Sequence, residues 1–325
     1  MGYHVFYRGR APPVKPTSAA AYAIMEAHLD DHRPLLKDAM PEDTPLLVSS
    51  DWLAAHLHDP LVRIADVRWY LPHLGKSGAG EFAAGHVPGA VYVDVDTELA
   101  APRGSGPGRH PLPDMAVFEA AMRRIGVTPE THVIAYDDNS GTAARLWWLL
   151  QYTGHPRASL LDGGIAAWQA EGRPIESGMG CAYAPGSFTA RPQPGQVVDK
   201  AAVVALSERP NVLILDARAR ERYEGRIEPI DARPGHIPGA RSAPFIESLG
   251  PDGRFLSPAA LRARYVALGI DEAETVVAYC GSGVTACHDI LTLRLAGRND
   301  ALLYEGSWSD WAADDSLPAV VEIES

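Results

Sequence analysis

The sequence contains two copies of one pattern, and this repeat constrains the fold more than any other feature. Five short blocks recur in the same order along the 325 residues. The blocks of the first copy are IADVR at 64–68, GHVPGA at 85–90, IGV at 125–127, VIAYD at 133–137 and LLDGGIAAW at 160–168; those of the second are ILDAR at 214–218, GHIPGA at 235–240, LGI at 268–270, VVAYC at 276–280 and LLYEGSWSDW at 302–311. The first two pairs are offset by 150 residues and the IGV and VIAYD pairs by 143. A fixed order at a nearly constant offset indicates two homologous domains.

Each copy alternates short apolar runs with amphipathic stretches. In the second copy, VLIL at 212–215 and TVVAY at 275–279 are typical of buried strands, whereas 258–269 and 285–297 are typical of helices ending at glycine. This alternation predicts an α/β fold, with a mainly parallel sheet flanked by helices in each domain. We predict a flexible N-terminal extension at 1–44, a first domain at 45–173, a Gly/Pro/Ser-rich linker at 174–187 and a second domain at 188–325.

Composition narrows the class of protein. Hydrophobic content is 46%, charged content is 22% and the net charge is −12, which disfavours nucleic-acid and anionic-membrane partners. The sequence has neither an apolar run of membrane-spanning length nor a secretory layout at its start. Three cysteines, without C-x-x-C spacing, suit neither a disulfide framework nor a zinc site. We therefore expect a reducing, cytoplasmic setting and no metal.

One cysteine stands where chemistry is expected. Cys280 follows the apolar run 275–279 and precedes a loop with Gly281 and Gly283, which leads into a helix. Ligands bind at the carboxyl ends of parallel strands. Glycines let backbone N–H groups turn inward, and a helix N-terminus favours negative charge, so the loop is expected to stabilise a thiolate. Cys287, on the helix, is expected to be structural, and Cys181 lies in the linker.

The tandem arrangement of D-x-R, GH[IV]PGA and a strand–cysteine–loop–helix unit resembles the two-domain rhodanese-type sulfurtransferases over about residues 45–322. The resemblance implies two tandem rhodanese-like domains and a persulfide on Cys280 that passes sulfur from a donor to an acceptor. Asp137 takes the position equivalent to Cys280 in the first domain. A carboxylate cannot hold sulfane sulfur, so we expect the first domain to be a noncatalytic partner that covers the cleft.

The loop CGSGVTA resembles the 3-mercaptopyruvate sulfurtransferase branch of that family. It places Gly281, Ser282, Gly283, Val284 and Thr285 after the cysteine, where the thiosulfate-preferring branch carries basic residues. A mercaptopyruvate carboxylate suits a planar guanidinium. Arg222, in ERYEG, matches the family's substrate arginine. Arg226 and Arg233 are both candidates for a second clamp, and their spacing does not decide between them.

The resemblance also implies a relay of loop serine, first-domain histidine and acid. Ser282 matches the serine and His86 the histidine, but the acid position falls at Ser77. Because His236 occupies the same place in the second copy, His86 also suits a structural role. The Asp66–Arg68 and Asp216–Arg218 pairs and Arg145 are expected to be structural.

Alternative functions remain open at this point. Within the family, the alternative is a thiosulfate:cyanide sulfurtransferase. A cysteine-dependent phosphatase or arsenate reductase needs an arginine six residues after the cysteine, where this chain has Ala286. A persulfide carrier or regulatory module is the non-enzymatic reading. The resemblance implies a small anionic sulfur donor, a thiol or cyanide acceptor, a thioredoxin-like reductant among possible partners, and no cofactor.

Overall fold

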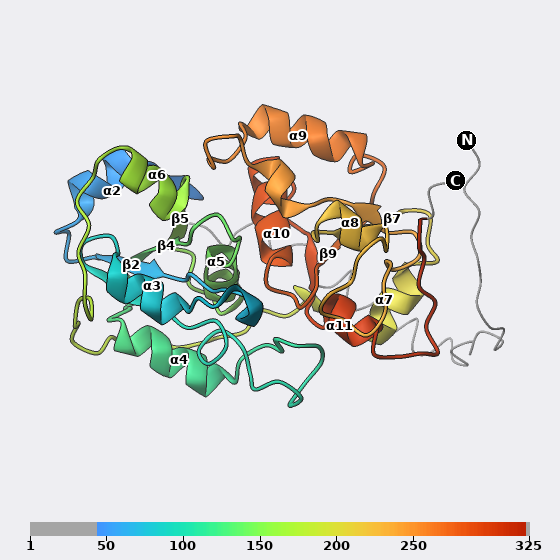
Figure 1. The fold of residues 1–325 in the computed structure, drawn as a ribbon, viewed down its shortest axis with the longest axis horizontal. Coiled ribbons are helices and arrows are strands. Elements are labelled where there is room, and N and C mark those ends of the chain that lie inside the picture. Colours follow the sequence, from blue (N-terminus) through green and yellow to red (C-terminus); the bar gives the residue numbers. More distant parts are fainter. Residues whose placement is uncertain (1–43, 323–325) are drawn as a thin grey trace.

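The computed structural model describes residues 44–322, which form two α/β halves that lie side by side (Figure 1). The predicted N-terminal extension lies almost wholly outside the described residues. The first half contains β1 (Leu47–Val48), α2 (Ser50–His56), β2 (Val62–Asp66), η1 (Pro72–Leu74), α3 (Gly78–Ala84), β3 (Ala90–Tyr92), α4 (Met115–Arg124), β4 (His132–Tyr136), α5 (Ala143–Tyr152), β5 (Ala158–Leu161) and α6 (Gly164–Ala170). The second half contains β6 (Val197–Val198), α7 (Lys200–Leu206), β7 (Val212–Asp216), α8 (Arg220–Tyr223), β8 (Arg241–Ser242), η2 (Phe245–Ser248), α9 (Pro258–Ala267), β9 (Thr275–Tyr279), α10 (Ala286–Leu295), β10 (Leu302–Tyr304) and α11 (Ser307–Trp311).

The two sheets have the same topology. Their strand orders are β1-β5-β4-β2-β3 and β6-β10-β9-β7-β8, and every pairing is parallel. Strands β4 and β9 sit in the middle, and each is buried over its last four residues. Parallel strands that are covered on both faces consist of continuous apolar runs, and both central strands have such a run in the sequence. The predicted α/β fold with two homologous domains is confirmed.

The same ion pair fixes the end of the second strand in each half. Arg68 Nη2 lies 2.6 Å from Asp66 Oδ2 and donates to the Gly85 carbonyl at 2.7 Å. Arg218 repeats both contacts at the same distances, with Asp216 and the Gly235 carbonyl. Both pairs are buried, and each ties a strand end to its GHxPGA block. The repeated blocks are therefore a structural frame.

The helices begin and end where local chemistry favours it. Ser257 caps α9 by accepting from the Ala260 N–H, and Pro258 occupies the first helical position. Asp114 caps α4 by accepting from the Ala116 N–H. The predicted helices at 258–269 and 285–297 are observed as α9 and α10.

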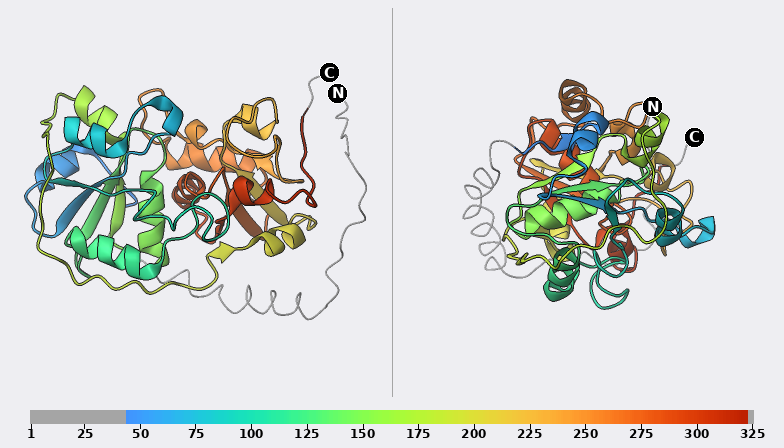
Figure 2. Two further views of the ribbon diagram at one scale, coloured as in Figure 1. Left: turned by 60° about the horizontal axis from the view of Figure 1, so that its bottom comes forward. Right: turned by 90° about the vertical axis from the view of Figure 1, so that its left-hand side faces the viewer.

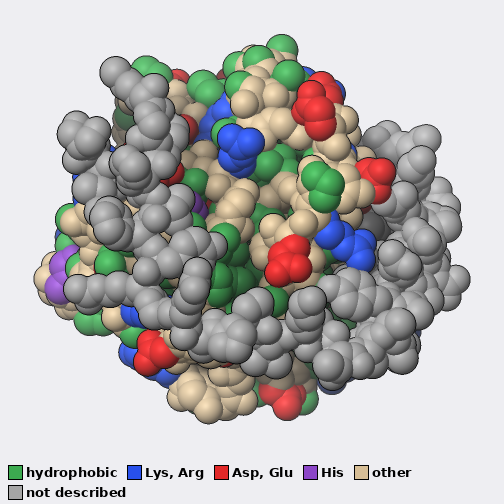
Figure 3. Space-filling model, turned by 90° about the vertical axis from the view of Figure 1, so that its right-hand side faces the viewer, with side chains coloured by type: hydrophobic (Ala, Val, Ile, Leu, Met, Phe, Trp, Pro, Cys, Tyr) green, Lys and Arg blue, Asp and Glu red, His purple; other side chains and the backbone are tan. Residues whose placement is uncertain are grey.

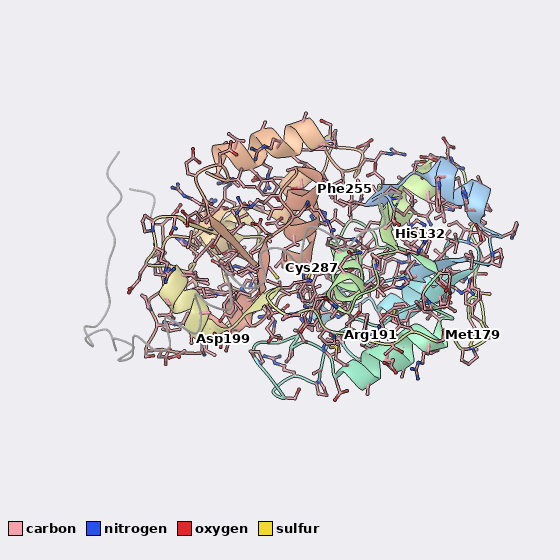
Figure 4. All side chains as sticks on the ribbon, turned by 180° about the vertical axis from the view of Figure 1, so that it is seen from behind. His132, Met179, Arg191, Asp199, Phe255 and Cys287 are labelled. Carbon is pink, nitrogen blue, oxygen red and sulfur yellow. The ribbon has the colours of Figure 1, made fainter. Side chains whose placement is uncertain are left out.

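The halves share an apolar core. Helices α5 and α10 pack against each other, and one buried cluster contains residues of both, among them Leu146, Trp147, Cys287 and Leu291. Cys287 lies near the middle of the molecule, on the side of α10 that meets the first half (Figure 4). This contact sets the carboxyl end of β9 against loops of the first half.

The segment between the halves is an ordered strap. It runs as extended chain along the outside of the first half (Figure 2). Backbone hydrogen bonds tie it there from Glu176, which pairs with His86, to Gln193, whose N–H donates to the Tyr152 carbonyl. Phe188 is buried in the shared core. The strap's contacts with the first half thus continue past the predicted linker, which ended at residue 187.

Within residues 44–322, none of the helices has the length and apolar character needed to cross a membrane. At the end of the molecule seen in Figure 3, the visible basic and acidic side chains are interspersed with apolar ones.

Candidate active site

Cys280 directly follows β9, and its loop turns backbone N–H groups toward the sulfur. The Gly283 N–H donates to Cys280 Sγ at 3.1 Å, and the Ser282 N–H lies 3.5 Å away. Gly283 has φ +80°, and a Cβ there would lie 2.5 Å from the Glu305 carbonyl oxygen, so only glycine fits without strain. These N–H groups form a nest that favours negative charge on the sulfur or on an atom bound to it.

The backbone of Cys280 is anchored from the other side. Its N–H donates to Ser307 Oγ at 3.1 Å, and its carbonyl accepts from the Trp308 N–H at 2.9 Å. Ser307 has a positive φ of 53°, and its hydroxyl also donates to the Tyr304 carbonyl at 2.9 Å. The sulfur is thus held rigidly at a strand end, in the place where parallel sheets bind ligands.

Cys280 opens onto a cavity of about 460 Å³ between the halves. The second half contributes the loop from Cys280 to Thr285 (apart from Gly283), Arg222 and Phe245, and the first half contributes Trp69, Tyr70, Arg109, His110 and residues 138–140. Cys280 is only 2% exposed and Ser282 only 7%. A ligand that reached the sulfur would therefore be largely removed from water, where electrostatic contacts are strong.

Ser282 is hydrogen-bonded to a histidine and, through it, to a carboxylate. Ser282 Oγ lies 2.7 Å from His110 Nδ1, and His110 Nε2 lies 3.0 Å from Asp96 Oδ1. Trp69 Nε1 donates to the other Asp96 oxygen at 2.8 Å. The hydrogen bond from His110 is the main cause that lowers the pKa of Asp96. Because an ionised carboxylate only accepts, the imidazole proton belongs on Nε2, and Nδ1 accepts from the serine hydroxyl.

His86 does not reach this site. It is fully buried, stacks on Phe82 at 4.0 Å and bonds through Nδ1 to the Phe82 carbonyl at 2.8 Å. His236 repeats this arrangement with Tyr223. Ser77, the expected acid position, caps α3. The expected pairing of Ser282 with His86 is therefore corrected to a pairing with His110. The histidine of each GHxPGA block instead bonds to a backbone carbonyl of its own half.

A signal for His110 was present in the repeat. The offset between the copies falls from 150 at the GHxPGA blocks to 143 at the IGV and LGI blocks. The first copy therefore has seven more residues between these blocks. This longer segment carries Asp96, Arg109 and His110, and it crosses to the second half, where the Arg109 N–H donates to Ser309 Oγ and the Leu112 N–H to Glu305 Oε2.

Arg222 lines the cavity beside the cysteine loop. Its Nη2 donates to Glu228 Oε1 and Asp231 Oδ2, both at 2.8 Å. A Cβ at Gly281 would lie 3.4 Å from Arg222 Nη1 and 2.8 Å from Arg109 Nη2. Arg109, which the sequence did not single out, is thus a second arginine near Gly281.

The other two candidate arginines are engaged elsewhere. Arg233 donates to the carbonyls of Trp311, Ala312, Asp314 and Leu317, at 2.8–3.2 Å, and does not line the cavity. The expectation that it clamps the donor is therefore corrected, because all three of its nitrogens hold the C-terminal segment. Arg226 pairs with Glu224 and is largely exposed.

Asp137 occupies the same place in the first half as Cys280 in the second. Its Oδ1 accepts from the Asn139 N–H and its Oδ2 from the Ala143 N–H, both at 2.8 Å. Burial raises the pKa of Asp137 to about 6. The Asp137 carboxylate thus accepts the backbone N–H groups of its own loop. In the second half, the corresponding N–H groups face the reactive sulfur of Cys280.

The remaining cysteines and Arg145 lie outside the reacting position. Cys287 is fully buried, which raises its thiol pKa to about 12, whereas Cys181 is exposed on the strap. Arg145 is fully buried and donates to the carbonyls of Leu99, His110 and Gly283 at 3.2–3.3 Å. It therefore connects the relay histidine of one half to the cysteine loop of the other.

Comparison with known proteins assigns the chain to one family. A family model described as a rhodanese-like domain matches residues 49–171 and 199–314. The chain is 43% identical to a probable 3-mercaptopyruvate sulfurtransferase of Pseudomonas aeruginosa, over 84% of this chain and 96% of that protein. It is 40% identical to SseB of Mycobacterium tuberculosis, provisionally named a thiosulfate sulfurtransferase, over 80% of this chain and 90% of that protein. Among solved structures it resembles SseA of Escherichia coli, a 3-mercaptopyruvate sulfotransferase with the rhodanese fold, with a TM-score of 0.72, 35% identity and coverage of 82% of this chain and all of the other.

Proposed function

The chain belongs to the rhodanese-like family, and from this premise we propose that it moves sulfur from 3-mercaptopyruvate, through a Cys280 persulfide, to a thiol or cyanide acceptor. The observation that carries the proposal is the Cys280 sulfur held in a nest of N–H groups at the floor of a cavity. Ser307 and Trp308 hold this loop from behind through hydrogen bonds to the Cys280 backbone, so that the sulfur is presented in one position.

The first half-reaction loads the cysteine. The Cys280 thiolate attacks the sulfur of mercaptopyruvate; an S–S bond forms while the C–S bond of the donor breaks, and the electron pair leaves as the enolate of pyruvate. The proton that leaves the donor's thiol is returned to the enolate carbon, which gives pyruvate. The N–H groups of Ser282 and Gly283 stabilise charge on the persulfide.

Ser282, His110 and Asp96 are suited to move that proton. The Ser282 hydroxyl donates to His110 Nδ1, so the serine oxygen can take a proton as its own passes to the histidine, and the reverse transfer delivers one to the leaving enolate. Asp96 holds the imidazole with Nε2 protonated and stabilises the imidazolium that forms. This relay is useful for an enolate, which needs a proton, and of little use for sulfite, which leaves thiosulfate as a stable anion.

The loop composition supports mercaptopyruvate as the donor. Gly281 and Ser282 supply no cation of their own, and the guanidinium groups near them are already paired with carboxylates. Arg222 binds the donor's carboxylate through Nη1, which lies toward Gly281. The thiosulfate alternative is therefore not favoured, although one relative carries that name.

The second half-reaction unloads the persulfide. A thiolate or cyanide attacks the outer sulfur, takes it and restores the Cys280 thiolate. A thioredoxin-like dithiol acceptor would end as a disulfide and release hydrogen sulfide. We place the protein in the cytoplasm, because a free catalytic thiol persists in a reducing compartment. The first half carries no reactive sulfur, and it contributes His110 and Asp96 to the proton relay.

The experiment is a loading assay by intact mass. After treatment with mercaptopyruvate and removal of excess donor, the wild-type mass should rise by one sulfur atom, and Cys280→Ser should show no gain. Cys287→Ser is the matched control, since that thiol is buried in the first turn of α10 and its replacement should leave loading unchanged. A sulfur adduct that persists in Cys280→Ser, with turnover retained, would overturn the proposal.

Arg222 is tested by kinetics. Loss of a charge-assisted contact made in the transition state should lower kcat/KM for mercaptopyruvate roughly 30- to 1000-fold in Arg222→Ala. Arg220→Ala is the control on the same helix, because Arg220 pairs with Glu247 on the surface and does not line the cavity. Equal kinetics in the two variants would reject Arg222 as a donor-binding residue.

A further inference from the structure

Arg145 is a fully buried cation at the contact between the halves. It lies on α5, has no exposed surface and does not line the cavity. Its Nε, Nη1 and Nη2 donate to the carbonyls of Leu99, Gly283 and His110 at 3.2–3.3 Å. The guanidinium lies 6.0 Å from the centre of the Trp148 ring. Each nitrogen of the side chain therefore has a hydrogen-bond partner, but all of these partners are neutral.

The arginines that line the cavity are held differently, because each of them forms an ion pair. Their carboxylate partners are Asp231 for Arg109, Asp216 and Glu228 for Arg218, and Glu228 and Asp231 for Arg222. Among residues 44–322, Arg145 has no such partner. A buried charge without a counter-ion is costly, since it loses its hydration and gains no attraction in return. The surroundings of Arg145 are thus short of one negative charge.

One residue separates this guanidinium from the reactive sulfur. The Gly283 N–H donates to Cys280 Sγ at 3.1 Å, and the Gly283 carbonyl accepts from Arg145 Nη1 at 3.2 Å. The nitrogen and the oxygen of one residue lie less than about 4 Å apart, so Nη1 is no more than about 10 Å from the sulfur. Arg145, Cys280 and Cys287 are all buried, and two charges separated by protein interior interact more strongly than across water.

Cys287 lies beside Arg145 but does not supply the missing charge. Burial raises the pKa of its thiol to about 12, while the charge of Arg145 acts in the opposite sense and the charge of Cys280 adds to the rise. At neutral pH Cys287 is therefore an uncharged thiol, and it donates to the Gly283 carbonyl at 3.4 Å. Because both charges act on this one thiol, Arg145 and Cys280 belong to the same buried neighbourhood.

We propose that Arg145 is a positioning residue that supplies, from behind the loop, the positive charge that balances negative charge on the Cys280 sulfur. The proposal rests on the sulfurtransferase function proposed above, in which this sulfur alternates between a thiolate and a persulfide. Neutral donors could satisfy three carbonyls, so the hydrogen bonds alone do not require a cation. Since Arg145 lies outside the cavity, its charge stays in place while donor and acceptor enter and leave.

The pH profile of Cys280 alkylation measures this charge without any sulfur donor. Iodoacetamide is neutral; it transfers its CH₂ group to the thiolate sulfur and releases iodide. The rates at Cys280 and at the exposed Cys181 are measured by peptide mass in one sample, between about pH 5 and pH 10. A unit charge about 10 Å away shifts such a profile by about one pH unit. Arg145→Gln should therefore raise the midpoint for Cys280 by about one unit and leave that of Cys181 in place.

The other titratable groups at the cavity are the same in this variant and in the wild type. Within residues 44–322 they are Tyr70, Asp138 and His110, with Asp96 bonded to the histidine, from the first half, and the paired arginines and acids named above. Glu305, behind the loop, accepts from the Leu112 N–H. A shift of the midpoint in Arg145→Gln thus reports the loss of one charge.

Two further variants separate the charge from the hydrogen bonds. Arg145→Lys keeps the charge and loses the fixed fork of donors, so it should lower the melting temperature and leave the midpoint near that of the wild type. Arg294→Gln removes a cation from the same α5–α10 contact, where Arg294 donates to Gln151, but about 12 Å beyond Ala286 along α10. Its midpoint should not move. Equal shifts in Arg145→Lys and Arg145→Gln would overturn the proposal, as would an equal shift in Arg294→Gln.

Stability measurements decide the question if Arg145→Gln folds poorly. At about pH 9, where a thiolate is populated, Arg145→Gln should lower the urea midpoint more in the wild type than in Cys280→Ser, whose hydroxyl stays neutral. A variant that folds only together with Cys280→Ser would support the proposal in the same way. An equal loss in both backgrounds, or failure to fold in both, would show that Arg145 serves the fold alone.

The outcomes for the two proposals are distinct. If the alkylation midpoint stays in place in Arg145→Gln while the wild type converts mercaptopyruvate, the function stands and the role of Arg145 is rejected. If the midpoint rises in Arg145→Gln while the wild type fails to convert mercaptopyruvate, the buried charge stands and the proposed donor is rejected.

Discussion

Replacing His110 with asparagine should separate the two sulfur donors. The substitution removes the imidazole that lies 2.7 Å from Ser282 Oγ and 3.0 Å from Asp96 Oδ1, and it puts in its place a side chain that does not titrate. With mercaptopyruvate the leaving enolate needs a proton in the first half-reaction. With thiosulfate the leaving sulfite needs no proton. The substitution should therefore lower the rate with mercaptopyruvate and leave the rate with thiosulfate nearly unchanged.

The magnitude follows from the position of the relay. A positioned acid–base group contributes about 10²- to 10⁴-fold, or roughly 3–5 kcal/mol of barrier. Ser282 and His110 are both buried, so water replaces the imidazole poorly. Asp96 is different, because its side chain is 55% exposed and its interaction is screened. We expect His110→Asn to lose at least a hundredfold in kcat for mercaptopyruvate, and Asp96→Asn about tenfold.

The assay compares both donors at one pH and one acceptor concentration. In His110→Asn, kcat/KM for thiosulfate should stay within a few-fold of the wild type. His86→Asn is the matched control: it removes a buried histidine of the frame, so it should lower the melting temperature and leave the ratio of the two donors unchanged. Equal losses for both donors in His110→Asn would refute the proton relay, as would a donor-specific loss in His86→Asn.

Three further outcomes are expected. Replacing Gly281 and Ser282 with Arg and Lys should lower mercaptopyruvate activity and raise thiosulfate activity; an unchanged ratio of the two kcat/KM values would remove the loop as selector. Arg233→Gln should lower the melting temperature, because four backbone carbonyls lose their donor, while KM for the donor stays as in the wild type; a raised KM would contradict this. Burial raises the pKa of Asp289 to about 8, against about 4 in an unfolded chain, so its contribution to stability is greatest below pH 4 and is lost as pH rises to about 8. Asp289→Asn should therefore show a smaller loss of urea midpoint between pH 5 and 8 than the wild type, and an equal slope would count against it.

Sequence patterns predicted the parts of the molecule that repeat. The strand ends at Asp66 and Asp216, the helices α9 and α10, and Cys280 at the carboxyl end of β9 all follow from local periodicity and turn chemistry, which neighbouring residues encode. His86 misled for the same reason: it belongs to a repeated block, and that block serves each half's own frame.

The contacts between the halves could not be predicted in this way. Arg109 and His110 act on residues more than 100 positions away, and no local period records such a pairing. Their segment is seven residues longer than its counterpart in the second copy, so comparison of the copies has nothing to set beside the additional residues. The change in offset between the copies shows where the first copy has additional residues. It does not show that these residues reach the second half, because that depends on how α5 and α10 pack.

That packing has a consequence for how the molecule unfolds. The apolar cluster that includes Trp147 and Leu291 is completed by both halves, so unfolding either one would expose part of the other's interior to water. The halves are two domains by duplication, but their stabilities are coupled. A calorimetric scan should show one endotherm. A cavity made in α5 should lower the melting temperature of the second half as much as that of the first. Selection on stability therefore acts on the first half as strongly as on the second, although only the second carries the reactive sulfur.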